Sequence, residues 1–168
     1  MSANETVIEG RTWIFAEANL NTDLMMPNKG YPLPLPERAK LIFATYRPGW
    51  SEQVRAGDIL VAGRNFGAGS ARPAAEILRV LGIRALVAES INGLFFRNCV
   101  NYALPAMECP GVLDMVSEGD IVRVNVGAGI VENTRTGKIL DGSKMPPMLL
   151  DIINAGGTYE RLLRDGYI

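Results

Sequence analysis

The chain of 168 residues contains no histidine and only two cysteines, Cys99 and Cys109. Without histidine, no Ser-His or Cys-His catalytic pair can form within the chain. Two thiolates without histidine make a poor zinc site, and a cubane iron–sulfur cluster usually needs more thiolate ligands than two. We therefore predict that both cysteines are buried, that this chain binds no metal itself, and that any metal chemistry comes from elsewhere.

The sequence also lacks a strong charge of one sign and a long apolar run. A formal net charge of -1 gives no electrostatic reason to bind nucleic acid or an anionic membrane. The apolar runs are too short to span a bilayer, and residues 1–9 have no basic segment of the kind that begins a signal peptide. The composition, 48% hydrophobic and 21% charged, predicts one soluble globular domain, which we place in the cytoplasm.

Hydrophobic periodicity predicts alternating strands and helices in the middle of the chain. A strand at 58–62, a helix at 73–81 and a strand at 83–88 form a βαβ unit, so the two strands should lie parallel in one sheet. Residues 7–15 predict a strand, a turn and a second strand. The other predicted elements are helices at 37–46, 90–102, 146–155 and 159–164, and strands at 103–107, 119–126 and 130–133.

Two loops carry the residues of chemical interest. The first, residues 19–36, contains four prolines, which predict an extended and fairly stiff segment. A loop this long within a small domain is usually functional or disordered, and its apolar side chains argue against disorder. The second, residues 63–72, contains Gly63, Gly67 and Gly69 between a strand and a helix. Two interpretations remain open for this glycine-rich loop: a tight structural turn, or a site where backbone N–H groups bind a carboxylate or phosphate.

Ser70 and Arg72 are the candidate chemical groups of the glycine-rich loop. From its position alone, Ser70 is either the N-cap of the next helix or a nucleophile or base. As a base it would need stabilisation of its alkoxide by backbone donors and by a cation such as Arg72. The planar guanidinium of Arg72 also suits a substrate carboxylate. A dinucleotide site is not indicated, because the third glycine of that fingerprint is replaced by Arg72.

Taken together, several motifs resemble the family of 3-isopropylmalate dehydratase small subunits across nearly the whole chain. They are residues 10–13, 21–23 with Pro27, 57–70, 95–98, 104–105, 136–138 and 156–157. The resemblance implies an α/β fold, the three-layer β/β/α swivelling domain of the aconitase type, as a single domain over residues 1–168. It also implies a separate large catalytic subunit that holds a [4Fe-4S] cluster, no cofactor in this chain, and a small dicarboxylate substrate.

The resemblance assigns roles to six residues, numbered here in this sequence. Ser70 would abstract the proton, and five residues would contact the substrate: Arg72, Gly69, Tyr31, Pro32 and Leu33. The segment from Gly30 to Pro34 contains no arginine, so a third carboxylate, as in citrate, has no evident partner there. The apolar character of this segment favours an alkyl-substituted malate.

The chain departs from the family where the glycine-rich loop meets the helix. The family usually reads Gly-Ser-Ser-Arg-Glu-His-Ala, whereas this chain has Ala71, Pro73 and Ala74 at the positions of the second serine, the glutamate and the histidine. Three functions therefore stay open: isopropylmalate isomerisation in leucine biosynthesis, the same chemistry on another 2-hydroxy diacid of the dimethylmalate or methylcitrate type, and a non-catalytic partner domain.

Overall fold

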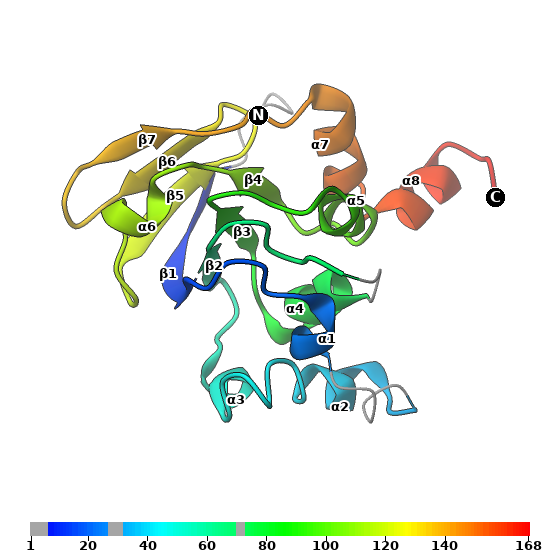
Figure 1. Ribbon diagram of the computed structural model, residues 1–168. Coiled ribbons are helices and arrows are strands. Elements are labelled where there is room, and N and C mark those ends of the chain that lie inside the picture. Colours follow the sequence, from blue (N-terminus) through cyan, green and yellow to red (C-terminus); the bar gives the residue numbers. More distant parts are fainter. Residues whose placement is uncertain (1–6, 27–31, 70–72) are drawn as a thin grey trace.

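Strand β1 (Val7–Phe15) lies at the centre of the sheet and has two kinds of neighbour. The computed structural model describes residues 7–26, 32–69 and 73–168, and within these ranges the sheet has seven strands in the order β4-β3-β2-β1-β5-β6-β7 (Figure 1). Residues 7–11 of β1 pair antiparallel with β5 (Ile121–Asn125), and residues 12–15 pair parallel with β2 (Ile59–Ala62). The sheet therefore consists of a parallel part and an antiparallel part that share β1.

The parallel part contains the βαβ units. Helix α4 (Ala74–Leu81) joins β2 to β3 (Ala85–Ala88), and helix α5 (Gly93–Asn101) joins β3 to β4 (Ala106–Glu108). Every residue of β2 and β3 is buried, as expected for parallel strands covered on both faces. The predicted parallel pairing of these two strands is confirmed.

The antiparallel part consists of residues 7–11 of β1 and three strands that follow β4 in the chain. Strand β5 pairs with β6 (Ile130–Asn133), which pairs with β7 (Ile139–Asp141). Along β5, Val122 and Val124 are buried while Ile121 and Arg123 are exposed, so one face of these strands packs inward.

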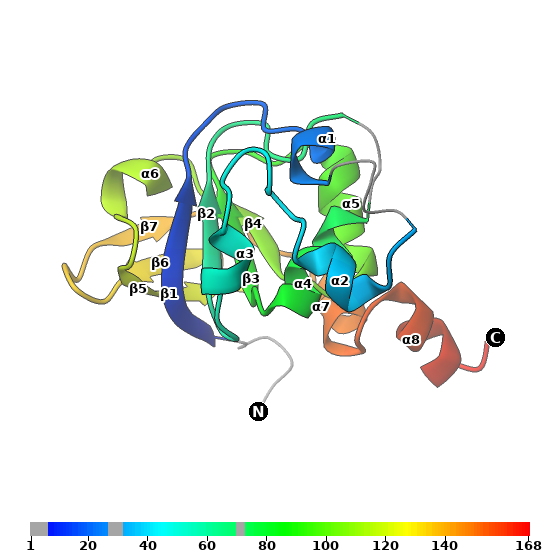
Figure 2. The same ribbon diagram turned by 90° about the horizontal axis from the view of Figure 1, so that it is seen from below.

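The parallel part separates two hydrophobic layers. Along β2, Leu60 and Ala62 belong to the layer under the helices, whereas Ile59 and Val61 belong to the layer that contains Val122 and the other inward residues of the antiparallel strands. The order of the layers is thus helices, parallel strands and antiparallel strands, which can be followed in Figure 2. This arrangement confirms the predicted α/β fold with a β/β/α layering.

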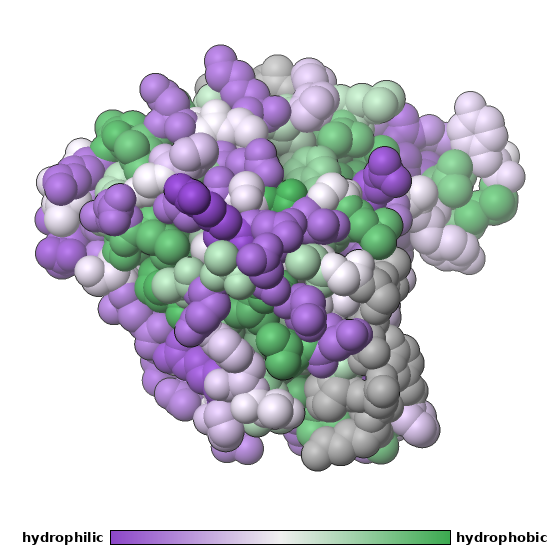
Figure 3. All heavy atoms as spheres, in the orientation of Figure 1, coloured by the Kyte–Doolittle hydropathy of each residue, from purple (hydrophilic) through white to green (hydrophobic). Residues whose placement is uncertain are grey.

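The remaining helices are short or lie near the C-terminus. Their bounds are α1 (Thr22–Met25), α2 (Leu35–Ala39), α3 (Trp50–Gln53), α6 (Val112–Met115), α7 (Pro147–Asn154) and α8 (Thr158–Arg164). Helices α1 to α3 lie in the connection from β1 to β2 and cover the helical layer, through Met25, Ala39 and Trp50. Helix α8 projects from the body, at the right of Figure 1, and Leu163 on it is exposed. Hydrophobic and hydrophilic residues are mixed on the corresponding part of the surface in Figure 3.

Two predictions of secondary structure are wrong. Residues 7–15 form one continuous strand rather than two, because Gly10 does not form a turn: a Cβ at this position would lie 2.1 Å from the carbonyl oxygen of Gly57. The glycine allows two backbones to approach each other. The helix predicted at 37–46 ends at Ala39, and turns follow it, with Phe43 in the left-handed region at a φ of 57°.

Other predicted elements exist with shifted bounds. The helix predicted to begin at Ser90 begins at Gly93, because the side chain of Asn92 caps it. The proline-rich segment contains α1 and the start of α2, and its residues 27–31 lie outside the described residues. Helix α6 and strand β7 were not predicted. No helix in the described part of the chain is long and apolar enough to span a membrane.

Candidate functional site

The predicted site residues divide into two groups. Three lie outside the described residues: Ser70, Arg72 and Tyr31. Three are described: Gly69, Pro32 and Leu33. Pro32 and Leu33 precede α2, and the Leu33 carbonyl oxygen accepts a hydrogen bond from Nη2 of Arg38 at 3.1 Å. Helix α2 packs against α4, the helix that follows the glycine-rich loop. The segment with Pro32 and Leu33 and the glycine-rich loop therefore each lead into one of two helices that contact each other.

The described part of the glycine-rich loop, residues 63–69, depends on glycine at two positions. Gly67 and Gly69 have φ values of +79° and +99°, a region that side chains disfavour. A Cβ on Gly67 would lie 2.2 Å from Cγ of Phe95 on α5, whereas a Cβ on Gly69 would lie at an ordinary 3.5 Å from Cβ of Asn21. Gly67 is therefore needed for its conformation and for space, and Gly69 for its conformation. Residues 63–69 therefore form a tight turn, and the alternative of a carboxylate or phosphate site in this loop stays a prediction.

Backbone hydrogen bonds join this loop to the segment that follows β1. The amide of Gly67 donates to the carbonyl oxygen of Leu20 at 2.9 Å, and the amide of Thr22 donates to the carbonyl oxygen of Ala68 at 3.0 Å. The residue next to Ala68 is Gly69, which leads directly to Ser70. Residues 67 and 68, shortly before the predicted base, are thus held by backbone hydrogen bonds to residues 20 and 22.

The other side of the same loop pairs with the segment that follows β3. The amide of Phe66 donates to the carbonyl oxygen of Ser90 at 3.1 Å, and the amide of Asn92 donates to the carbonyl oxygen of Phe66 at 2.9 Å. The Ser90 hydroxyl also accepts a hydrogen bond from the amide of Asn65 at 2.8 Å. Three loops are therefore joined where the carboxyl ends of β1, β2 and β3 meet, the edge at which open α/β sheets bind their ligands. We call this the carboxyl edge.

Three asparagine side chains connect these loops in sequence, and we call Asn19, Asn65 and Asn92 the asparagine row. Nδ2 of Asn92 donates to Oδ1 of Asn65 at 3.4 Å, and Nδ2 of Asn65 donates to Oδ1 of Asn19 at 2.8 Å. Each of the three asparagines comes from a different loop of the carboxyl edge. Sequence reasoning missed this row, although asparagine is a residue that tolerates the left-handed φ of 59° at Asn19 and 51° at Asn65.

Two carboxylates at the carboxyl ends of β3 and β4 bind backbone amides. Glu89 accepts hydrogen bonds from the amides of Gly111 at 2.8 Å and Leu113 at 3.1 Å, and Glu108 accepts one from the amide of Ile91 at 2.8 Å. Both side chains thereby connect the loops after β3 and β4. Their hydrogen bonds give them a role in holding these loops.

The departures at Pro73 and Ala74 have a visible structural consequence. Pro73 stands at the N-cap of α4 without a side-chain hydrogen bond, and Ala74 and Ala75 are fully buried in the helical layer. Where the family usually has a glutamate and a histidine, this chain therefore begins α4 with a proline and a core alanine.

Both cysteines are buried, as predicted, and they lie in different layers. Cys99 belongs to the layer under the helices and Cys109 to the layer of the antiparallel strands. Burial raises the pKa of the Cys99 thiol, and burial with the nearby carboxylates of Glu89 and Asp141 raises the pKa of Cys109 to about 11. Neither thiol is suited to ligate a metal, and the described residues contain no group of three or more metal-ligating side chains.

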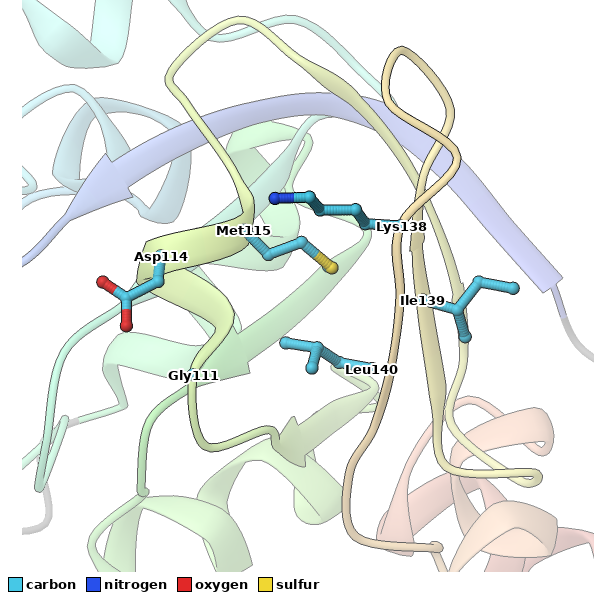
Figure 4. Close-up of a pocket in the computed structure, with 6 residues that line it drawn as sticks. All are labelled: Gly111, Asp114, Met115, Lys138, Ile139 and Leu140. Atoms are coloured by element: carbon cyan, nitrogen blue, oxygen red, sulfur yellow. The ribbon is translucent and has the colours of Figure 1, made fainter.

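A pocket of about 290 Å³ lies in the antiparallel part, away from these loops (Figure 4). It is lined by Gly111, Asp114, Met115, Lys138, Ile139 and Leu140. The side chains of Met115 and Leu140 point into the space between α6 and β7, and the carboxylate of Asp114 points away from it. None of the lining residues lies in the glycine-rich loop or is one of the predicted site residues, so this pocket is separate from the candidate site.

A buried polar network holds the β5–β6 region of the antiparallel part. Asp120 accepts hydrogen bonds from Nε of Arg135 at 2.7 Å, from Nδ2 of Asn133 at 2.8 Å and from the amide of Ser117 at 3.0 Å. These hydrogen bonds, the one from Arg135 above all, lower the pKa of Asp120 below that of an ordinary aspartate. Because the network lies in the turns beside β5 and β6, its role is to hold the antiparallel part together.

The fold is that of the aconitase C-terminal domain class. Residues 41–111 match the family model described as the aconitase C-terminal domain. A crystal structure of 3-isopropylmalate dehydratase from Methanocaldococcus jannaschii superposes with a TM-score of 0.88 at 28% identity, and covers 96% of each chain.

Curated relatives define the family more narrowly. The 3-isopropylmalate dehydratase small subunit 1 of Methanopyrus kandleri is 39% identical over 162 residues, 95% of each chain. The isopropylmalate/citramalate isomerase small subunit of Methanocaldococcus jannaschii is 38% identical over 154 residues, 90% of this chain and 91% of that relative. The chain belongs to the family of 3-isopropylmalate dehydratase small subunits.

Proposed function

We propose that this chain is the small subunit of a heteromeric hydro-lyase that interconverts 2-isopropylmalate and 3-isopropylmalate by removing and re-adding water. The observation that carries the proposal is the 39% identity, over 95% of both chains, to a relative named as a 3-isopropylmalate dehydratase small subunit. The reaction would serve leucine biosynthesis in the cytoplasm, with residues 1–168 acting as one swivelling domain.

In this proposal Ser70 is the base. It takes a proton from the carbon next to one carboxylate while the hydroxyl leaves the adjacent carbon, and a carbon–carbon double bond forms. Water then adds in the reverse orientation to give the isomer. A serine alkoxide needs strong stabilisation at neutral pH, and backbone donors in a loop of left-handed glycines can supply it. The left-handed conformation of Gly69, directly before Ser70, supports this role.

The other predicted residues hold the substrate. The Arg72 guanidinium can donate two parallel N–H hydrogen bonds to a substrate carboxylate. Gly69, three residues earlier in the chain, is proposed to contact the substrate through its backbone. Tyr31, Pro32 and Leu33 are proposed to surround the alkyl group. That segment contains no arginine, which supports a substrate with two carboxylates and an apolar substituent rather than a tricarboxylate.

Activity requires a large partner subunit in this proposal. When bound there, a [4Fe-4S] cluster supplies the Lewis acid that activates the substrate hydroxyl. The two cysteines of this chain are buried in different layers with raised thiol pKa values, and so they are unsuited to ligate a cluster. This supports a division of work in which the chain contributes the base and the carboxylate contacts.

A second candidate substrate is supported by one relative. The small subunit from Methanocaldococcus jannaschii is named for both isopropylmalate and citramalate, which differ in the size of the alkyl group. The replacements at Ala71, Pro73 and Ala74 lie next to the predicted substrate contacts and also keep another alkylmalate as an alternative.

The test is anaerobic co-expression with the large subunit, followed by dehydration assays on 3-isopropylmalate, citramalate, dimethylmalate and citrate. We expect a coloured complex that turns over 3-isopropylmalate fastest and citrate not at all, and a small subunit that is colourless and inactive alone. Turnover of only another alkylmalate would keep the mechanism and replace the substrate. A stable complex inactive on every diacid would favour a non-catalytic partner domain, and turnover by the isolated chain would overturn the proposal.

A further inference from the structure

The donor and acceptor of each hydrogen bond in the asparagine row are determined by the bond that Asn92 makes to α5. Asn92 caps α5 by accepting a hydrogen bond from the amide of Leu94 at Oδ1, so its Nδ2 must face the other way, toward Asn65. Oδ1 of Asn65 then accepts from Asn92, which leaves Nδ2 of Asn65 to donate to Asn19. The amide orientations are therefore fixed from the helix outward across all three loops.

Bonds this exposed add little to overall stability. Asn19 is exposed, Asn65 and Asn92 are half-buried, and hydrogen bonds in such places replace bonds to water at small net gain. The row nevertheless spans the loops at the point where the glycine-rich loop leaves β2. Beyond Asn65, the loop carries its two left-handed glycines and leads to Ser70, five residues further on. The row is thus placed to set where this loop lies relative to its neighbours.

We propose that Asn65, acting with Asn19, is a positioning residue for the glycine-rich loop and thereby for Ser70. Asn19 and Asn65 both adopt left-handed φ values, which asparagine, aspartate and glycine tolerate. Asparagine at these two positions therefore supplies both the left-handed backbone conformation and the side-chain hydrogen bond between them. This inference rests on the proposed function for its catalytic consequence, and on the structure alone for its effect on the loop.

The left-handed conformation makes clean variants available. Asn65→Gly and Asn19→Gly both allow the left-handed backbone conformation; Asn19→Gly removes the hydrogen bond between the two side chains, and Asn65→Gly removes that bond and the one from Asn92. Asn19→Asp keeps an acceptor for Nδ2 of Asn65 and is the conservative control. Asn133→Ala removes a buried asparagine from the antiparallel part and serves as the control for simple destabilisation.

The first readout is hydrogen exchange of residues 63–69 in the assembled complex, measured by mass spectrometry. We expect Asn65→Gly and Asn19→Gly to speed exchange in this segment about tenfold, while Asn19→Asp and Asn133→Ala leave it near the wild-type rate. The thermal midpoint of Asn65→Gly should stay within about 4 °C of the wild type. Unchanged exchange in both glycine variants would overturn the inference, whatever the enzymatic activity.

The second readout is steady-state kinetics of the complex on its best alkylmalate. Loss of loop position should lower kcat about tenfold in each glycine variant and leave KM nearly unchanged, because a misplaced base acts on the transition state. The double variant should lose no more than Asn65→Gly alone, since that variant already removes the bond that Asn19→Gly removes. Additive losses, or a loss in Asn19→Asp equal to that in Asn19→Gly, would overturn the positioning role. An inactive wild-type complex would count against the proposed function, and exchange would still decide the inference.

Discussion

The two parts of the sheet hold their loops with different chemistry. In the antiparallel part, Asp120 is nearly inaccessible to solvent, is paired with Arg135, and binds Asn133, whose side chain is fully buried. At the carboxyl edge, uncharged amides of Asn65 and its neighbours join loops that are partly open to solvent. Removing a hydrogen-bond partner from a buried polar group such as Asn133 is costly, whereas hydrogen bonds between partly exposed side-chain amides select one arrangement at little gain in stability. We infer that the hydrogen bonds of Asp120 contribute mainly to stability, whereas those of the asparagine row contribute mainly to the position of the glycine-rich loop.

The largest expected effect comes from Gly67, where the carboxyl edge meets the core. Gly67→Ala places a Cβ 2.2 Å from Cγ of Phe95 in a left-handed backbone, so we expect a loss of about 3 kcal/mol or more in unfolding free energy. Gly49→Ala is the matched control, because Gly49 has a φ of +77° with nothing within 4 Å, and should lose only about 1 kcal/mol. Urea denaturation measures both, and equal losses would show that contact with Phe95 does not matter.

The next largest effect separates the two networks. Asn133→Ala removes one donor to Oδ2 of Asp120, which keeps the amide of Ser117, and leaves the carbonyl oxygen of Met115 without its buried side-chain donor. It should therefore cost about 2 kcal/mol of unfolding free energy and leave kcat of the assembled complex unchanged. Asn65→Gly should lower kcat about tenfold and reduce the unfolding free energy by less than about 1 kcal/mol. If Asn133→Ala lowers kcat as strongly as Asn65→Gly, the division between stability and position fails.

A smaller effect is expected in the pH dependence of stability. Because the pKa of Asp120 is lowered in the folded state, the unfolded state takes up the proton first as the pH falls. The stability from this carboxylate is therefore complete above the ordinary aspartate pKa of about 4 and declines below it, toward the lowered folded pKa. The difference in unfolding free energy between wild type and Asp120→Asn should shrink as the pH drops from 5 to about 3. A difference that is constant or grows over this range would contradict the assignment.

The smallest effect is the absence of thiol reactivity. The pKa of Cys99 is raised, and that of Cys109 is about 11, so neither should react with a thiol reagent at pH 8 in the native protein. Because one cysteine lies in each layer, the variants Cys99→Ala and Cys109→Ala report on the two layers separately. We expect both remaining thiols to react only at the rate of global unfolding. Faster reaction of Cys109 would show that the antiparallel part opens more easily than the helical layer.

The sequence predicted the parts of the fold that depend on local patterns. Strands β2 and β3 are continuous apolar runs, and α4 has a proline before it and Gly82 after it, so their types and parallel pairing followed directly. Gly10 misled the prediction, because a glycine that allows a backbone to approach Gly57 has the same sequence signal as a glycine in a turn. The short elements α6 and β7 have too few residues to show a period.

The candidate site was predictable only in part for a similar reason. The glycines and Ser70 are adjacent in sequence and follow a strand, so they could be found together. The asparagine row joins residues 46 and 27 positions apart, and its existence depends on which loops meet at the carboxyl edge. No single segment contains that information. An isolated asparagine in a loop is in most cases only a turn residue.

The most direct test of the account is kcat of the complex assembled with Ser70→Ala, measured on the alkylmalate that the wild type turns over fastest. Ser51→Ala is the matched control, because Ser51 donates to the carbonyl oxygen of Lys40, away from the carboxyl edge. We expect kcat to fall about a thousandfold for Ser70→Ala with an intact complex, and to stay at the wild-type value for Ser51→Ala. An intact Ser70→Ala complex with kcat within about twofold of the wild type would contradict this expectation.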